Sequence, residues 1–338
     1  MRAIGRIMLG LVLFICAACA SGAIAPDEVP SPPDQATVLE TVVVTGVMPG
    51  PGMWRVHRGG HSLWILGTLQ PVARRMRWES GEVERIVSDA QVILYPPTLR
   101  VDLGMGRLRT LMLLPALLGA RKNPDGDRLV EQVSAEDYAR WLQLKQNYLG
   151  RDRAVEKRRP IFAADALYRA ALERSDLQIK GLVSPVVKRA ARRHGIPVER
   201  PQVEVRVDDP RGAIREFRET EINDAECFRK TLDHLEQDLE KMRLRANAWA
   251  TGDMLTLRQV TYEDQSRACM DAVFESRFAE RQGIRDLAVK LRATWLETAG
   301  KILDEHERAF AVLPLGLMLG PDGYLAELAA RGYVIEEP

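Results

Sequence analysis

Alternating apolar and polar positions open the folded part of the chain, and helical periodicity follows. Two strand-like runs, 54–57 and 62–66, flank Arg58-Gly59-Gly60 and predict a β-hairpin that starts a domain at about Met53. A helix is expected over 79–88. A short apolar strand follows over 92–95, and Pro96-Pro97 ends it.

Helical patterns dominate the middle of the chain. Helices are predicted over 103–119, 135–149, 160–175 and 184–194, and the run VEVRV at 203–207 is strand-like. The first of these helices is apolar enough to cover a sheet or a groove. Two longer helices, 213–245 and 264–298, flank a break over 247–253 and predict a long helical hairpin.

The chain closes with a strand over 309–313, a helix over 322–331 and a strand over 333–335. The pattern as a whole contains few strands and many helices. It predicts an α/β or α+β fold with one small mixed β-sheet, helices around it and the long helical hairpin.

The first residues have the layout of a secretory signal. Arg2 and Arg6 precede an apolar run that is too short to span a bilayer, and small residues follow it. We therefore expect residues 1–20 to be a signal peptide and the protein to be exported, to the periplasm or to the outer membrane. Two outcomes stay open, because cleavage before Ser21 gives a soluble protein whereas lipidation of Cys19 gives a lipoprotein.

Residues 21–52 are rich in proline and small side chains, which predicts a flexible linker. One segment interrupts it, the strongly β-prone ETVVVTG at 40–46, which resembles a TonB box. Such a segment would dock by pairing with a partner's sheet edge. The alternative is a first strand of the domain or an apolar stretch of linker.

Charge gives little indication of a nucleic-acid partner. The chain has 48 Lys and Arg against 47 Asp and Glu, and loss of residues 1–20 removes two arginines, so the mature chain is close to neutral. Acidic residues are interleaved with most of the basic clusters. We expect no nucleic-acid binding, and membrane contact only through a lipid on Cys19.

Two cysteines lie outside the signal, Cys227 and Cys269. They stand at equal distances from residue 248, where the predicted hairpin turns, so an antiparallel hairpin brings the two sulfurs to the same level. In an oxidising compartment this placement predicts a disulfide. Two unrelated free thiols are the alternative.

Both ends of the folded part resemble the TraB/GumN family. The matching segments are 54–56 and 62–69 at the front, 309–312, 320–325 and 328–334 at the back, and a Trp-x-x-Gly-Asp element at 249–253. The resemblance implies one domain over 53–338 with a helical insertion at about 100–300, and a fold similar to that of Tiki-type and EreA/ChaN proteins. It also implies metal-dependent hydrolysis by two Gly-x-x-His motifs and a glutamate at one end of the sheet.

This chain departs from the family pattern at each implied metal ligand. The first motif ends in Gln70 instead of histidine, the second histidine position falls on Leu317, and the glutamate position falls on Tyr95 or Pro96. These side chains are poor ligands for zinc-like ions. We therefore expect no metal, no cofactor and no catalytic residue here, only a degenerate site that could bind a ligand. Its positions are Gly67, Thr68, Gln70, Tyr95, Pro96, Gly316 and Leu317.

The five histidines offer no replacement set of ligands. His57 and His61 flank the hairpin turn and are expected to be exposed, and His194 is expected at a helix C-terminus. His234 and His306 lie among acidic residues, which is typical of solvated helix faces.

These observations favour an exported, catalytically degenerate protein that binds a peptide or a protein partner in the cell envelope. A divergent metal-dependent hydrolase of the peptidase type, with unidentified ligands, is the alternative. A third interpretation is an accessory factor for envelope or polysaccharide assembly. It rests on segment 40–46 and on the gene clusters in which the family is found.

Overall fold

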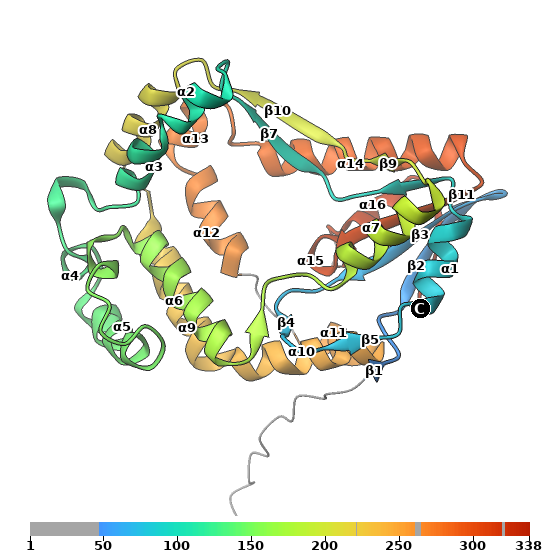
Figure 1. Ribbon diagram of the computed structural model, residues 1–338, viewed down its shortest axis with the longest axis horizontal. Coiled ribbons are helices and arrows are strands. Elements are labelled where there is room, and N and C mark those ends of the chain that lie inside the picture. The colour runs from blue at the N-terminus through green and yellow to red at the C-terminus, as the bar shows by residue number, and fades with distance from the viewer. Residues whose placement is uncertain (1–46, 221, 261–264, 320–321) are drawn as a thin grey trace, which may run out of the picture. The chain divides into compact units, whose positions relative to one another are not determined.

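The computed structural model describes residues 47–220, 222–260, 265–319 and 322–338. Its main sheet has six strands in the order β12-β2-β3-β11-β6-β9. Of these, β2, β3, β9 and β11 are labelled in Figure 1. These strands are β2 (Met53–Arg58), β3 (His61–Thr68), β6 (Val92–Leu94), β9 (Val198–Glu199), β11 (Arg308–Pro314) and β12 (Val334–Glu336). Strands β3, β11, β6 and β9 run parallel, whereas β2 is antiparallel to β3 and to β12. The hairpin and the mixed α and β composition predicted from the sequence are confirmed.

Strand β11 forms the centre of the sheet. It pairs with β3 from Arg308 opposite Ser62 to Pro314 opposite Thr68, and residues 309–313 are all buried. Helices cover the sheet, which explains the continuous apolar run of this strand. Helix α1 (Gly81–Asp89) contacts β11 and pairs with α7 (Val183–His194), while α14 (Leu287–Glu305) contacts β3, β11 and α16 (Tyr324–Ala330).

Three two-stranded sheets accompany the main sheet, where the sequence predicted only one sheet. They are β1 (Val47–Met48) with β5 (Arg77–Trp78), β4 (Val72–Ala73) with β8 (Leu177–Gln178), and β7 (Thr98–Asp102) with β10 (Gln202–Arg206). Strand β1 lies within the stretch predicted as linker, so the folded part begins before Met53. The TonB-box-like segment 40–46, Cys19 and the signal lie outside the described residues.

The helical insertion has a hydrophobic core of its own. Its main helices are α5 (Ala135–Tyr148), α6 (Pro160–Arg174) and α9 (Asp224–Gln237), with α4 (Leu129–Gln132) and the 3-10 turns η1 (Pro124–Gly126) and η2 (Val155–Lys157) beside them. Trp141 and Phe228 lie at its centre, with ring centres 5.3 Å apart. The domain therefore contains two cores, one around the sheet and one within the insertion.

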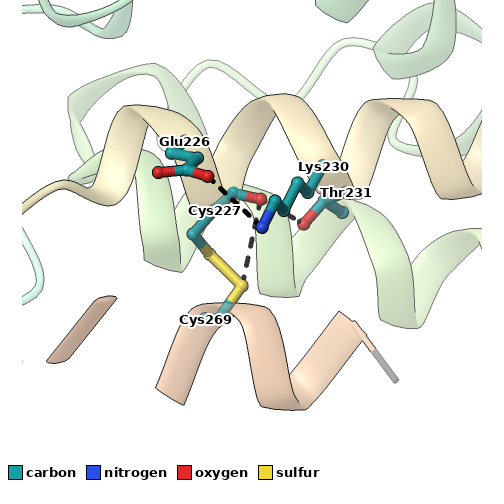
Figure 2. The surroundings of a disulfide bond; sticks show 5 residues. All are labelled: Glu226, Cys227, Lys230, Thr231 and Cys269. Carbon is teal, nitrogen blue, oxygen red and sulfur yellow. Dashed lines mark hydrogen bonds and ion pairs between the residues drawn. A yellow bond between two sulfur atoms is a disulfide. The ribbon is translucent and has the colours of Figure 1, made fainter. Parts of the chain in front are cut away.

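The two long helices of the predicted hairpin are each broken, which corrects that expectation. Stretch 213–245 covers most of α8 (Pro210–Glu219), all of α9 and the first half of α10 (Leu239–Thr251). Stretch 264–298 covers α12 (Gln265–Phe274), α13 (Arg277–Arg281) and part of α14. A short α11 (Met254–Gln259) lies between the two stretches. The predicted disulfide is present: Cys227 on α9 and Cys269 on α12 are bonded, with their Cα atoms 4.7 Å apart (Figure 2).

Stretch 103–119 is also not the single covering helix that the sequence predicted. It forms two short helices, α2 (Arg107–Leu111) and α3 (Leu114–Gly119), and most of its leucines are exposed. The short helix α15 (Leu315–Met318) follows β11 directly. Within the described ranges, no helix has both the length and the apolar character needed to cross a bilayer.

Candidate functional site

The parallel strands bring the predicted site positions to one edge of the sheet. Thr68 at the end of β3 pairs with Pro314 at the end of β11, so Gln70 and the residues of α15 follow neighbouring strands. Tyr95 follows β6, the strand on the other side of β11. The carboxyl ends of parallel strands share an edge, and ligand sites of α/β proteins form at such edges.

Gly67 is required here for space. A Cβ atom at this position would come within 2.4 Å of Leu315 Cδ2 and 3.2 Å of Trp54 Cζ3. Trp249 approaches from α10 and donates a hydrogen bond from Nε1 to the Gly67 carbonyl oxygen, at 2.9 Å. Apolar side chains therefore pack closely around the backbone of the first motif.

Gln70 and Leu317 both present side chains to solvent. Gln70 is exposed and its Nε2 faces Gly181, where an added Cβ would lie 3.2 Å away. Leu317, on α15, is 39% exposed, and the space beside Gly316 is open. Thr68 is half-buried at the end of β3. The two positions of the expected histidines thus carry an exposed amide and an exposed isobutyl group.

Tyr95 is a neutral phenol at neutral pH. Its side chain is half-buried, and the Arg200 guanidinium lies 4.5 Å from the ring centre. Burial raises the pKa of Tyr95, and the charge of Arg200 only partly opposes this shift. Pro96, the other candidate for the glutamate position, is half-buried and carries no titratable group.

The side chains at this edge do not fit a divalent metal ion. A carboxamide, an isobutyl group and a neutral phenol replace the imidazoles and the carboxylate that such an ion prefers. Elsewhere in the described part of the chain, no group of three or more His, Cys, Asp or Glu side chains is placed to hold a metal. We therefore derive no metal-dependent step at this edge.

Three histidines differ from the expectation of exposed side chains. The rings of His57 and His61 are both partly buried. His57 Nε2 lies 3.1 Å from Glu336 Oε1, and His61 Nδ1 forms a hydrogen bond of 2.7 Å with the Leu303 carbonyl oxygen. His234 is only 6% exposed. Helix α9, which carries His234, packs into the second core. The acidic residues near His234 in the sequence do not indicate this burial.

His194 ends α7, as expected. Gly195 follows it in the left-handed conformation, with φ of 65°. The imidazole of His194 is exposed. The C-terminus of α7 therefore lies at the residue that the sequence predicted, with glycine after it.

The Trp-x-x-Gly-Asp element is a structural unit. Besides the Trp249 hydrogen bond to β3, Gly252 ends α10 with φ of 73°, and Asp253 begins α11 by accepting a hydrogen bond from the Thr256 amide at 3.0 Å. The hydrogen bonds from Thr256 lower the pKa of Asp253. The element therefore turns the chain and fixes it against the end of β3.

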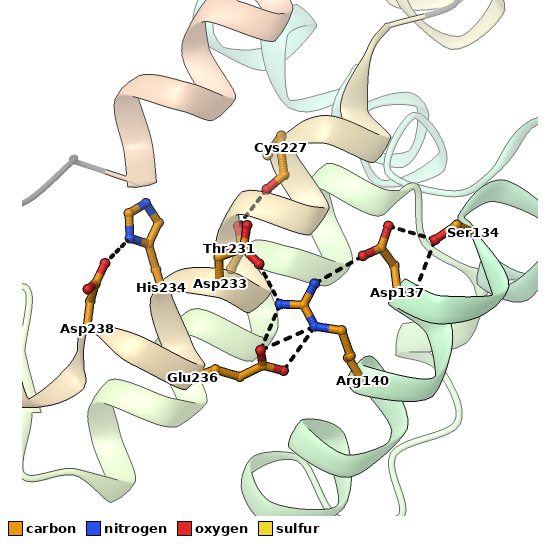
Figure 3. A network of polar contacts seen from close by, with 9 residues as sticks. All are labelled: Ser134, Asp137, Arg140, Cys227, Thr231, Asp233, His234, Glu236 and Asp238. Atoms are coloured by element: carbon orange, nitrogen blue, oxygen red, sulfur yellow. Dashed lines mark hydrogen bonds and ion pairs between the residues drawn. The ribbon is translucent and has the colours of Figure 1, made fainter.

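A polar network that sequence patterns did not single out joins two helices of the insertion. Arg140 on α5 reaches Asp233 Oδ1 at 2.5 Å and Glu236 Oε2 at 2.7 Å on α9, and Asp137 on its own helix (Figure 3). On the same helix α5, Lys145 donates a hydrogen bond to the buried Glu156. Asp233 and Glu236 are far from Arg140 in the sequence, so only the fold shows that these charges are matched.

One family model matches the chain, that of the TraB/PrgY/gumN family, and it covers residues 52–337. No curated protein matches the chain, and no solved structure does. The match spans both cores and the whole strand edge described above.

Proposed function

The chain belongs to the TraB/PrgY/gumN family, and from this premise we propose that it is a catalytically inactive member that binds a peptide or a protein partner in the cell envelope. The observation that carries the proposal is the chemistry of the strand edge. Three neighbouring parallel strands lead to Gln70, Leu317 and Tyr95, where hydrolysis would need metal ligands.

The same edge has the mixture of groups that peptide recognition uses. Leu317 offers an exposed apolar contact, Gln70 an exposed amide that both donates and accepts, and Tyr95 an aromatic ring beside the Arg200 cation. Aromatic, apolar and arginine side chains are enriched at the centres of protein interfaces. This composition supports binding without chemistry.

The envelope location is part of the proposal. The signal-like residues 1–20 support export, and the disulfide between Cys227 and Cys269 supports an oxidising compartment. Mass spectrometry of the mature N-terminus tests the remaining choice. An acylated Cys19 would make the protein a lipoprotein, and an unmodified Ser21 would make it a soluble periplasmic protein.

Metal analysis tests the loss of catalysis. We expect purified protein, before and after incubation with zinc, manganese or cobalt, to hold no stoichiometric metal and to show no chelator-sensitive cleavage of peptides. Stoichiometric metal together with chelator-sensitive cleavage would overturn the proposal in favour of a divergent peptidase.

Photo-crosslinking tests binding at the strand edge. A photoreactive amino acid at Leu317 is expected to crosslink a partner, and the additional substitution Tyr95→Ala should abolish the crosslink. Leu255, which is 73% exposed on α11, provides the control position and should give no such product. Absence of a product at 317, or the same product at both positions, would refute binding at this edge.

A further inference from the structure

An apolar ridge lies on the exposed side of α2 and α3. We define the ridge by its six exposed side chains, which are between 47% and 78% exposed: Leu108, Leu111, Met112, Leu114, Leu117 and Leu118. Between the two helices Leu113 is buried and holds the ridge to the domain. An apolar surface of this kind on a folded domain marks an interaction site.

The chain segment that carries the ridge has charges of a single sign. Between Asp102 and Asp125 the sequence contains four basic residues and no acidic one. Two of them, Arg121 and Lys122, follow α3 directly and are exposed. An apolar ridge bordered by cations complements a surface that is apolar below and anionic at its boundary.

A basic hollow lies at the end of the ridge. It has a volume of about 620 Å³ and is lined by Gly119, the last residue of α3, and by three cations, Lys122, Lys157 and Arg218. None of the three cations forms an ion pair with a side chain that the structure describes. The exposed basic side chains of this hollow are therefore available to an anionic group.

The fold holds the three cations in place. The backbone N–H of Asn123 donates a hydrogen bond to the Lys157 carbonyl oxygen at 3.1 Å. This bond joins the segment of Lys122 to that of Lys157. The buried Arg159 donates to the Phe217 carbonyl oxygen at 2.8 Å, which fixes the turn of α8 that carries Arg218. Helix α8 also contacts α3. The hollow and the ridge are thus parts of one supported surface.

We propose that the ridge and the basic hollow together dock the protein on an anionic phospholipid bilayer. The six apolar side chains enter the boundary of the acyl region, and a headgroup phosphate accepts hydrogen bonds from Lys122, Lys157 and Arg218. This surface lies on elements other than the strand edge, and it gives the protein a membrane contact that does not depend on Cys19. A soluble anion would use the hollow but would leave the ridge exposed.

A local fluorescence experiment tests the docking. The full chain carries Cys16→Ser and Cys19→Ser, which removes any acyl chain, and Met112→Cys carries an environment-sensitive dye. With vesicles of phosphatidylglycerol and phosphatidylethanolamine the dye is expected to shift to the blue. The apparent partition coefficient should be at least about tenfold higher than with phosphatidylcholine vesicles. The same dye on Leu255→Cys is expected not to shift.

Charge reversal tests the hollow. Lys122→Glu, Lys157→Glu and Arg218→Glu together should lower the partition coefficient by about tenfold or more, since each cation adds to attraction by the anionic surface. The matched control is Lys188→Glu, Arg189→Glu and Arg192→Glu, three exposed cations on α7, and should leave partition unchanged. Circular dichroism should show all variants folded. No blue shift at position 112, an equal shift at 255, or an equal loss in the α7 control would each overturn the proposal.

Discussion

At the residue scale, Asp238 is a carboxylate that links a side chain of α9 to a side chain of α10. It lies where α9 ends and α10 begins, and its Oδ2 is 2.7 Å from His234 Nδ1 (Figure 3). Its Oδ1 is 2.5 Å from Lys241 Nζ. Burial raises the pKa of Asp238. The hydrogen bonds from Lys241 and His234, together with the charges of these two residues, lower it by more, so the net shift of the pKa is downward. The ionised carboxylate is therefore favoured in the folded protein.

The substitution Asp238→Asn should lower the free energy of unfolding by about 1–2 kcal/mol at neutral pH. Because the pKa is lower in the folded state, this contribution is present above about pH 4, the unfolded pKa, and is lost as the pH falls through the folded pKa. Urea unfolding at pH 7, 4 and 2.5 should therefore show wild type and variant converging in acid.

A matched control for this prediction is Glu305→Gln. Glu305 pairs with Lys301 at 3.9 Å on the exposed surface of α14, and its loss should change stability by less than about 0.5 kcal/mol at any pH. A difference between Asp238→Asn and wild type that grows on acidification would contradict the assigned direction of the pKa shift.

At the element scale, the fit between β3 and α15 depends on one missing side chain. Gly67→Ala would place a methyl group 2.4 Å from Leu315 Cδ2 and should cost about 1–3 kcal/mol through overpacking. Leu315→Ala alone leaves a cavity and should cost about 2–5 kcal/mol. In the double variant the new methyl group enters that cavity, so the double should be more stable than the sum of the two single effects predicts, by about 1 kcal/mol.

Denaturant unfolding of the four proteins in this cycle measures that difference. Strictly additive effects would show that Leu315 is not what excludes a side chain at Gly67. Trp249→Phe is a further comparison, because it removes the hydrogen bond to the Gly67 carbonyl oxygen and leaves Leu315 in place.

Elements with strong local patterns were predictable, and those that depend on distant partners were not. The β2–β3 hairpin, α1, α7 and β11 follow from periodicity and from glycine and proline signals. Strand β7 becomes a strand only by pairing with β10, more than a hundred residues later, and an apolar pattern alone could not tell it from the helix expected beside it.

Residues that favour helix ends mark the breaks in the two predicted long helices, although the helical periodicity continues across them. Asn223 precedes α9, Ser276 caps α13 by accepting a hydrogen bond from the Ala279 amide, and Gly283 has φ of 66° before α14. Asn and Ser favour helix N-termini because their side-chain oxygens accept hydrogen bonds from free backbone amides, and Gly favours helix C-termini because it adopts positive φ without strain. For the candidate site, the strand-end positions followed from the family pattern. Packing by Trp54 and Trp249 could not be predicted, because it depends on tertiary contacts.

At the scale of the whole molecule, the disulfide secures α12, whose most extensive contacts are with α9. Helix α9 belongs to the second core through Phe228, Leu232 and Leu235. The bond joins cysteines separated by 42 residues. In the chain-entropy account a loop of this length stabilises the folded state by up to about 4 kcal/mol.

The double substitution Cys227→Ala and Cys269→Ala should therefore lower the free energy of unfolding by as much as about 4 kcal/mol. A reductant should destabilise wild type to a similar extent and leave the variant unchanged. Thiol titration of unfolded, non-reduced wild type gives an independent check, because two reactive thiols from these positions would show that the bond does not form.

The central place of β11 has a consequence for how the protein is made. Its residues are among the last to be synthesised, yet they separate β3 from β6 in the sheet. A ribosome therefore releases both flanking strands and the entire helical insertion before the main core can close, which favours slow folding and reliance on chaperones. A premature stop before Arg308 removes β11 and leaves β3 and β6 without the strand that joins them.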